Sequence, residues 1–136
     1  MRVMLEPGAH APTRAFGTDA GLDIYAMYNA VIPAGGSARM VTGVHVELPP
    51  GTCGLLVSKS GLNVNSGITS TGLIDEGYTG AIIVKLYNQS DRTYTVHAGD
   101  KITQLVILPV VHEEVEIVDS IEGGDRGDAG FGSSGV

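Results

Sequence analysis

Short runs of valine, isoleucine, leucine and tyrosine recur along the chain, each bounded by glycine, proline, asparagine or aspartate. No run continues with the i, i+3, i+4, i+7 spacing of apolar residues that an amphipathic helix requires. Such runs between turn-forming residues are typical of strands. We therefore predict an all-β chain with these strands: Val3–Leu5, Gly21–Ala26, Ala30–Ile32, Ser37–Val41, Val44–Leu48, Gly54–Ser58, Gly67–Thr69, Ala81–Tyr87, Thr93–Val96, Lys101–Val111 and Val115–Ile117.

Glycine is over-represented and indicates frequent turns. It makes up 20 of the 136 residues, about twice the usual ~7%. Pro33–Gly36 and Pro49–Gly51 combine the fixed φ of proline with the positive φ that glycine accepts. Many short strands joined by turns favour a distorted β-barrel or jelly roll. Only Ser60–Ser66 could form a short helical turn.

Length, charge and cysteine content exclude several classes of protein. A chain of 136 residues fits one domain with a single core. A net charge of −7 argues against broad electrostatic binding of nucleic acid or an anionic membrane. With Cys53 as the one cysteine, no intrachain disulfide or cysteine-rich metal centre can form. Because no signal peptide or spanning segment is visible, we expect a soluble, cytoplasmic protein.

The last fourteen residues, 123–136, differ from the domain that residues 1–122 are expected to form. Six of them are glycine, and the segment has too few hydrophobic residues to bury itself. We expect a mobile arm, although a merely disordered end fits the composition equally well. Arg126, Phe131 and the nearby serines would suit an arm that wraps an anion and stacks on a ring.

Two polar clusters follow strands in the first half of the chain. Asp23 alternates with Leu22 and Ile24, so its side chain is expected to face away from the core, where a lone aspartate is usually just solvated. In Ser58–Leu62, the Ser60 hydroxyl, the Lys59 amine and exposed backbone N–H groups could hold phosphate. A plain turn explains that cluster as well, since the Walker spacing is absent.

Two more clusters lie in the second half. Gly72–Gly80 predicts a β-hairpin tip that carries Asp75 and Tyr78. A carboxylate held on a rigid hairpin could orient a water molecule as a general base, and an ordinary acidic loop is the alternative. Gln104 interrupts an apolar strand, and a buried amide needs partners, so a structural hydrogen bond in the core is its simplest interpretation.

Together with the arm and in this order, these clusters resemble the five motifs of the homotrimeric dUTP pyrophosphatase (dUTPase) family, from about Asp19 to Gly135. The resemblance implies a β jelly-roll protomer and hydrolysis of dUTP to dUMP and pyrophosphate with Mg²⁺. That reaction keeps uracil out of DNA and supplies dUMP for thymidylate synthesis. It also implies active sites assembled from three subunits of a homotrimer, in the cytoplasm of the cell or of a host cell.

The same resemblance implies roles around the hairpin. Asp75 corresponds to the catalytic carboxylate that orients the water attacking the α-phosphorus. Tyr78 corresponds to the ring that packs under deoxyribose and leaves no space for a 2′-hydroxyl. The positions whose backbone pairs with uracil and which exclude a C5 methyl group are Gly72, Leu73 and Ile74, with Ile83 across the hairpin.

Phosphate and arm contacts follow in the same way. Lys59, Ser60 and Gly61 correspond to the phosphate-binding motif, Gln104 to an amide near the phosphates, and Asp23 to the carboxylate that holds Mg²⁺ through water. In the arm, the expected contacts are Arg126 on the γ-phosphate, Phe131 over uracil, and Gly132 and Ser133 beside it.

The chain departs from the family pattern at two places, and two alternative functions remain open. Most cellular members have arginine at the position of Lys59, and many have an asparagine near Ile68–Thr71. A dCTP deaminase shares the fold, although the Gly72–Tyr78 hairpin suits a pyrophosphatase better. A regulatory binding protein on the same scaffold is the other alternative, although such functions usually depend on inserted segments.

Overall fold

A computed structural model describes residues 1–135, and Val136, the last residue of the expected arm, lies outside them. Ten strands and one short helix form within that range. They are β1 (Arg2–Leu5), β2 (Gly21–Tyr25), β3 (Ala30–Ile32), β4 (Ser37–Val41), β5 (Val44–Glu47), β6 (Thr52–Val57), α1 (Ser60–Ser66), β7 (Ile68–Ile74), β8 (Ile83–Asn88), β9 (Tyr94–Val96) and β10 (Lys101–Pro109).

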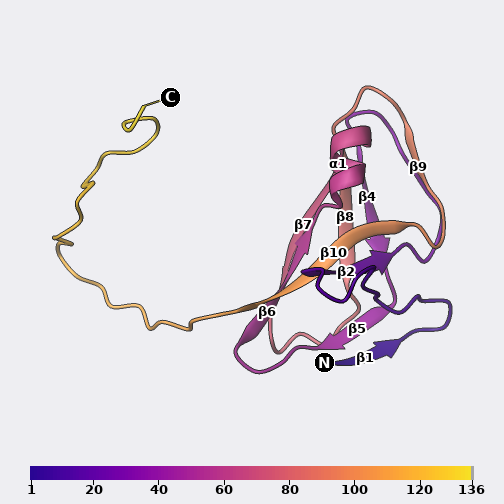
Figure 1. Ribbon diagram of the computed structural model, residues 1–136, viewed down its shortest axis with the longest axis horizontal. Coiled ribbons are helices and arrows are strands. Elements are labelled where there is room, and N and C mark those ends of the chain that lie inside the picture. The colour runs from indigo at the N-terminus through magenta and orange to yellow at the C-terminus, as the bar shows by residue number, and fades with distance from the viewer. Residues whose placement is uncertain (136) are drawn as a thin grey trace.

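All strand pairs are antiparallel, which confirms the predicted all-β architecture. One curled sheet has the order β2-β10-β6-β7-β8-β4, and β1-β5 and β3-β9 form two-stranded sheets beside it (Figure 1). The helix α1 occupies the predicted stretch between β6 and β7. It ends at Gly67, whose φ of 66° places the backbone in the left-handed region that favours glycine.

The core is filled by aliphatic side chains that alternate along the strands. In β8, for example, Val84, Leu86 and Asn88 are buried while Ile83, Lys85 and Tyr87 are exposed. The largest fully buried hydrophobic side chains come from strands or strand ends around the whole barrel: Ile24, Ile32, Met40, Ile68, Ile82, Leu86 and Leu105. This closed arrangement gives a rigid support for the loops between strands. No helix in residues 1–135 has the length and apolar composition needed to cross a membrane.

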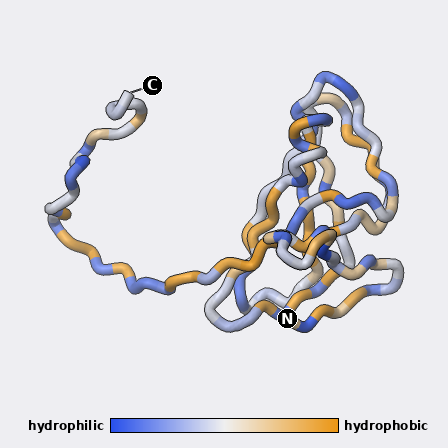
Figure 2. The backbone as a smooth tube through the Cα atoms, in the orientation of Figure 1, coloured by the Kyte–Doolittle hydropathy of each residue, from blue (hydrophilic) through white to orange (hydrophobic). Residues whose placement is uncertain are grey.

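Two strand predictions were wrong: one strand is longer than predicted, and another does not form. β7 continues from Ile68 to Ile74 instead of ending at Thr69, because it pairs first with β8 and then with β6. The predicted strand Val115–Ile117 does not form in this single chain. The segment after β10 leaves the body with alternating hydrophobic and hydrophilic residues (Figures 1 and 2), and a strand needs a partner to complete its hydrogen bonds.

The start of β5 fixes the connection between β7 and β8. The Ile82 N–H donates to the Val44 carbonyl (2.8 Å), and the Ile82 carbonyl accepts from both the N–H (3.1 Å) and the hydroxyl (2.8 Å) of Thr42. Ile82 and Thr42 are both buried. We call residues 75–82 the β7–β8 loop, and its returning end is thus held firmly against β5.

Candidate active site

A pocket of about 220 Å³ lies where β7 and β8 separate. The β7–β8 ladder begins where Ile68 is opposite Asn88 and ends where Ser70 is opposite Leu86. Beyond that point β7 pairs with β6, while β8 remains paired with β4 along its other edge. The diverging stretches therefore face one another without ladder hydrogen bonds in the part of the chain that is described. The pocket is lined by Leu56, Gly72, Leu73, Ile74, Asp75, Tyr78, Ile82 and Ile83.

The predicted hairpin residues thus come together in one place, and Leu56 and Ile82 join them. Sequence reasoning missed these two, because an aliphatic residue in a strand carries no sign that it borders a pocket. Gly72 lies close to Leu56, since a Cβ atom at Gly72 would come within 3.2 Å of Leu56 Cδ1. A side chain at position 72 would therefore narrow the pocket from its inner wall.

The β7–β8 loop presents Asp75 and Tyr78 together at the rim of the pocket. The Tyr78 N–H donates to the Asp75 carbonyl at 3.0 Å, which closes a turn between them. The Tyr78 hydroxyl donates to the Ala81 carbonyl at 3.0 Å, and its ring passes over Gly80, where a Cβ atom would lie 2.5 Å from that hydroxyl. The Asp75 residue is exposed, so its carboxylate is available to solvent.

A second cluster surrounds Asp23 on β2. Lys59 Nζ donates to Asp23 Oδ1 at 2.5 Å, and Lys101 Nζ donates to Asp23 Oδ2 at 2.7 Å. Asp23 is only 5% exposed, and a backbone bridge to Thr13 covers the edge of its strand. The expectation that Asp23 is an ordinary solvated aspartate was therefore wrong: it lies on the face opposite Ile24 but beneath two lysine side chains.

The two lysines control the ionisation of Asp23. Burial by itself would raise the pKa of Asp23, but hydrogen bonds and charge from Lys101 and Lys59 outweigh it and lower that pKa. In return, the hydrogen bond and the charge of Asp23 raise the pKa of Lys101. Sequence reasoning missed Lys101, because nothing along the chain shows that β10 lies beside β2.

A chain of hydroxyl groups positions the segment that carries Lys59. The Ser58 hydroxyl accepts from the Ser70 N–H (2.9 Å) and donates to the Ser70 carbonyl (3.0 Å). The Ser70 hydroxyl meets that of Thr103 at 2.8 Å, and the Thr103 hydroxyl donates to the Val57 carbonyl at 2.9 Å. These contacts tie β6, β7 and β10 together just before Lys59, Ser60 and Gly61, which open α1.

Gln104 does not lie in the core, contrary to its simplest sequence interpretation. It is partly exposed on β10, opposite both Asp23 and Val57. Its side chain passes over Gly21, where a Cβ atom would come within 2.9 Å of Gln104 Oε1. The absence of a side chain at Gly21 thus leaves room for the amide to lie flat next to the Asp23 cluster.

The predicted arm residues lie away from both clusters in this single chain (Figure 1). Arg126, Phe131, Gly132 and Ser133 belong to two successive turns, closed by hydrogen bonds from the Ala129 N–H to the Arg126 carbonyl and from the Ser133 N–H to the Gly130 carbonyl. Phe131 is fully exposed. Their contact with a ligand stays a prediction.

Asp75, at the rim of the pocket, and Lys59, in the Asp23 cluster, lie beyond opposite ends of the β6–β7 pair. Thr71 is opposite Val57, Asp75 follows Thr71 by four residues, and Lys59 follows Val57 by two in the opposite direction. Six residues of strand correspond to roughly 20 Å.

The family model for dUTPase matches residues 8–135. The chain belongs to the dUTPase family. Curated relatives described as deoxyuridine 5′-triphosphate nucleotidohydrolase include that of Eremothecium gossypii, 43% identical over 129 residues (93% of this chain, 84% of that protein). Another, from Gloeothece citriformis, is 42% identical over 135 residues (97% of this chain, 93% of that protein).

Solved dUTPase structures share the fold of this chain. A mutant dUTPase of Staphylococcus bacteriophage 80alpha with dUpNHpp has a TM-score of 0.92 at 32% identity and covers 99% of this chain and 98% of its own. A mutant dUTPase from phage phi11 of S. aureus, described as coordinating a structural Mg(II) ion, has a TM-score of 0.82 at 30% identity, over 90% of this chain and 98% of its own. The dUTPase resemblance inferred from the five motifs is thereby confirmed.

We predict that Asp23→Asn loses about 2 kcal/mol of unfolding free energy at neutral pH, because two lysines lose their buried counter-ion. The pKa of Asp23 is lowered in the folded chain, so its stabilising effect is present above the ordinary carboxylate pKa and lost as pH falls through the lowered value. Urea unfolding as a function of pH measures this.

The exposed aspartate Asp91 provides the matched control, since its side chain is 95% exposed. Asp91→Asn is expected to behave as the wild type at every pH. An Asp23→Asn chain as stable as the wild type at neutral pH would contradict the importance of the two ion pairs.

Proposed function

We propose that this dUTPase hydrolyses dUTP to dUMP and pyrophosphate, by in-line attack on the α-phosphorus of a water molecule oriented by Asp75. The observation that carries the proposal is the placement of Asp75 and Tyr78 on one loop at the rim of the β7–β8 pocket. An exposed carboxylate can accept a hydrogen bond from water and direct its lone pair.

The walls of the pocket suit uracil. The backbone of Gly72–Ile74 faces the start of β8 beyond the point where the ladder ends, so N–H and C=O groups are available to the edge of a planar base. Cytosine presents the opposite donor and acceptor pattern and would leave buried polar groups unpaired, a strong basis for discrimination. Ile83 lies on the opposite wall, where we expect it to exclude a C5 methyl group.

Tyr78 is proposed to select the sugar. Its hydroxyl is fixed to the Ala81 carbonyl, and the ring is held over Gly80, so it cannot easily retreat from the rim. A ring fixed beneath deoxyribose would clash with a 2′-hydroxyl. UTP is thereby excluded by a steric contact that dUTP does not make.

The Asp23 cluster is proposed to bind the phosphates. Lys59 carries its charge on a flexible stem and can turn from Asp23 to a phosphate oxygen, while Lys101 stays on the other carboxylate oxygen and keeps Asp23 ionised. The Ser60 hydroxyl, the Gly61 backbone and the Gln104 amide are proposed as further contacts on the same side.

At the Asp23 cluster, Mg²⁺ fits only as an ion that takes most of its ligands from the nucleotide and from water. No group of three or more acidic, histidine or cysteine side chains in residues 1–135 could hold a metal. Mg²⁺ keeps several waters and binds through one or two carboxylates plus phosphates, and the Asp23 carboxylate retains lone pairs beyond the two that the lysines use. When bound, the ion would neutralise triphosphate charge, and Asp23 would hold it through water.

A complete site is proposed to need several copies of the chain, as in a homotrimer. One copy would provide the β7–β8 pocket with Asp75 and another the Asp23 cluster, because roughly 20 Å of strand separates Asp75 from Lys59 within one chain. The segment after β10 supports such an assembly. Its Val111, Val115, Ile117 and Ile121 are each at least 79% exposed, and exposed apolar residues in this number mark an interaction surface.

The arm is proposed to close over the bound nucleotide, with Arg126 on the γ-phosphate, Phe131 over the base, and Gly132 and Ser133 beside them. Its glycines permit the backbone to follow the ligand, and closure would exclude bulk water from the reaction. The comparisons do not favour a dCTP deaminase or a purely regulatory protein, since the curated relatives named above are deoxyuridine nucleotidohydrolases.

Pyrophosphate release from a panel of nucleotides with Mg²⁺ tests the proposal. The wild type should prefer dUTP to dCTP, dTTP and UTP, and Asp75→Asn should lower kcat about 10²-fold or more while dUTP still binds. Glu76→Gln, a charge change one residue along, is the control and should retain most of the rate. A near-normal kcat for Asp75→Asn, or ammonia release from dCTP, would contradict the proposal.

Truncation after Gly124 tests the role of the arm. We predict a folded, assembled protein with severely reduced turnover, because the groups that close the site are gone while the β body is intact. Circular dichroism and size-exclusion chromatography establish folding and assembly, and pyrophosphate release measures activity. A fully active truncated chain would show that the arm has no part in the reaction.

A further inference from the structure

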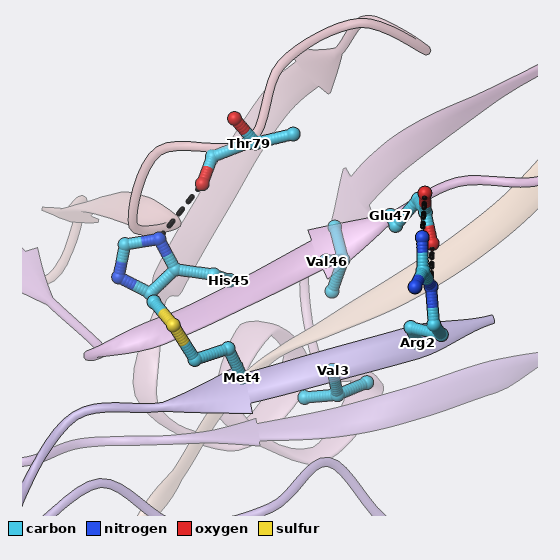
Figure 3. Close-up of a pocket in the computed structure, with 7 residues that line it drawn as sticks. All are labelled: Arg2, Val3, Met4, His45, Val46, Glu47 and Thr79. Carbon is cyan, nitrogen blue, oxygen red and sulfur yellow. Dashed lines mark hydrogen bonds and ion pairs between the residues drawn. The ribbon is translucent and has the colours of Figure 1, made fainter.

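His45 on β5 contacts two oxygen atoms that belong to different parts of the chain. Its Nδ1 lies 2.8 Å from the Thr79 carbonyl oxygen in the β7–β8 loop, as Figure 3 shows. Its Nε2 lies 2.9 Å from Glu6 Oε1, just after β1. The His45 side chain is 18% exposed and the Glu6 side chain 42% exposed, so the ring is partly buried between its two partners.

Both partners of His45 are hydrogen-bond acceptors. A backbone carbonyl can only accept, and so can an ionised carboxylate. A neutral imidazole carries one N–H and would leave one of the two contacts without a proton. The imidazolium form, with a proton on each nitrogen, satisfies both contacts at once. The geometry therefore favours a charged His45 wherever Glu6 is ionised.

The other charged groups around His45 do not oppose this charge. From β1, Arg2 faces the same pocket, but it forms a two-point ion pair with Glu47 of β5, which balances its charge (Figure 3). Met4 is the residue opposite His45 in the β1–β5 register, and the β7–β8 loop provides Thr79 without a charge. Glu6 is thus the unbalanced charge nearest to the ring.

The pKa of His45 is raised by these surroundings. The hydrogen bond to Glu6 makes the largest contribution, the Thr79 carbonyl adds to it, and together they outweigh the effect of burial. Glu6 is itself held in place, because its N–H donates to the Gly43 carbonyl at 2.9 Å. This bond holds the Glu6 backbone beside the start of β5, and its carboxylate reaches the ring nitrogen that faces away from the loop.

Thr79 directly follows Tyr78. The returning end of the β7–β8 loop is already fixed at Ile82 by Thr42 and Val44, and His45 adds a second attachment nearer to the tip. We propose that protonated His45, held by Glu6, is a positioning residue for the β7–β8 loop that fixes Tyr78 against the deoxyribose. The role of Tyr78 at the sugar rests on the proposed function, whereas the attachment of the loop by protonated His45 does not.

The proposal has a defined pH dependence. Both hydrogen bonds are complete below the ordinary histidine pKa of about 6.5, and the doubly bonded form is lost as pH rises through the raised pKa of His45. The neutral ring then holds one partner at a time, and the loop is attached less firmly. We expect KM for dUTP to rise across that range and discrimination against UTP to fall, with little change in kcat.

The protonation state is measured directly by NMR of the histidine ring nitrogens in the full chain without nucleotide. We expect both nitrogens of His45 to stay protonated to a higher pH than those of an ordinary histidine, and Glu6→Gln to lower the pKa of His45. A pKa for His45 at or below about 6.5 in the wild type would overturn the proposal. This result is independent of the reaction, so it separates failure of the proposal from failure of the proposed function.

The kinetic test compares His45→Gln with the wild type in dUTP and UTP hydrolysis over a range of pH. Glutamine cannot donate to both partners, so we expect KM for dUTP about three- to tenfold above wild type at low pH, no KM step on raising the pH, and kcat nearly unchanged. His97→Gln, which removes a histidine from the β9–β10 turn, should keep the wild-type profile.

If His45→Gln fails to fold, the variant Glu6→Gln provides the test in its place. It should move the KM step to lower pH, because the neutral amide supports the imidazolium less well than the carboxylate does. A KM step that stays at the wild-type pH in Glu6→Gln, or a wild-type pH profile and UTP discrimination in His45→Gln, would overturn the proposal.

Discussion

The point where β7 leaves β8 is the constraint on which the rest of the site depends. β7 pairs with β8 up to Ser70 and with β6 from Thr71 onward, so the sheet opens without losing a strand. That opening creates a pocket with backbone edges for walls and places the β7–β8 loop at its rim. The core beneath is closed and aliphatic, which keeps the opening in a fixed shape. The pocket that we propose for the base thus follows from strand pairing.

The Asp23 cluster depends on a buried ion pair and not on strand pairing alone. Asp23 is buried and binds two lysines, and its negative charge offsets part of the repulsion between their amines on one face. We propose that Lys101 keeps Asp23 ionised when Lys59 turns to a phosphate, which would make Lys59 available at a low electrostatic cost. Because Lys59 lies roughly 20 Å along the sheet from Asp75, we propose that the chemistry is shared between chains of an assembly.

Sequence reasoning correctly predicted an all-β fold, the position of the short helix and the pocket-lining residues Gly72–Asp75, because these depend on local pattern and motif order. It failed for Lys101, which it did not name, and for the interpretation of Gln104 as a core residue, because both depend on β10 lying between β2 and β6. It also failed for Val115–Ile117, which is a strand by composition but has no partner in one chain. Long-range pairing and assembly are not written in local periodicity.

Mixed assembly tests the shared site most directly. Asp75→Asn chains and Lys59→Ala chains, each inactive alone, are unfolded together, refolded and assayed for dUTP hydrolysis. If each site takes Asp75 from one chain and Lys59 from another, random assortment restores about a quarter of the wild-type rate. If the mixture is no more active than its two components, the site lies within one chain and the account is wrong.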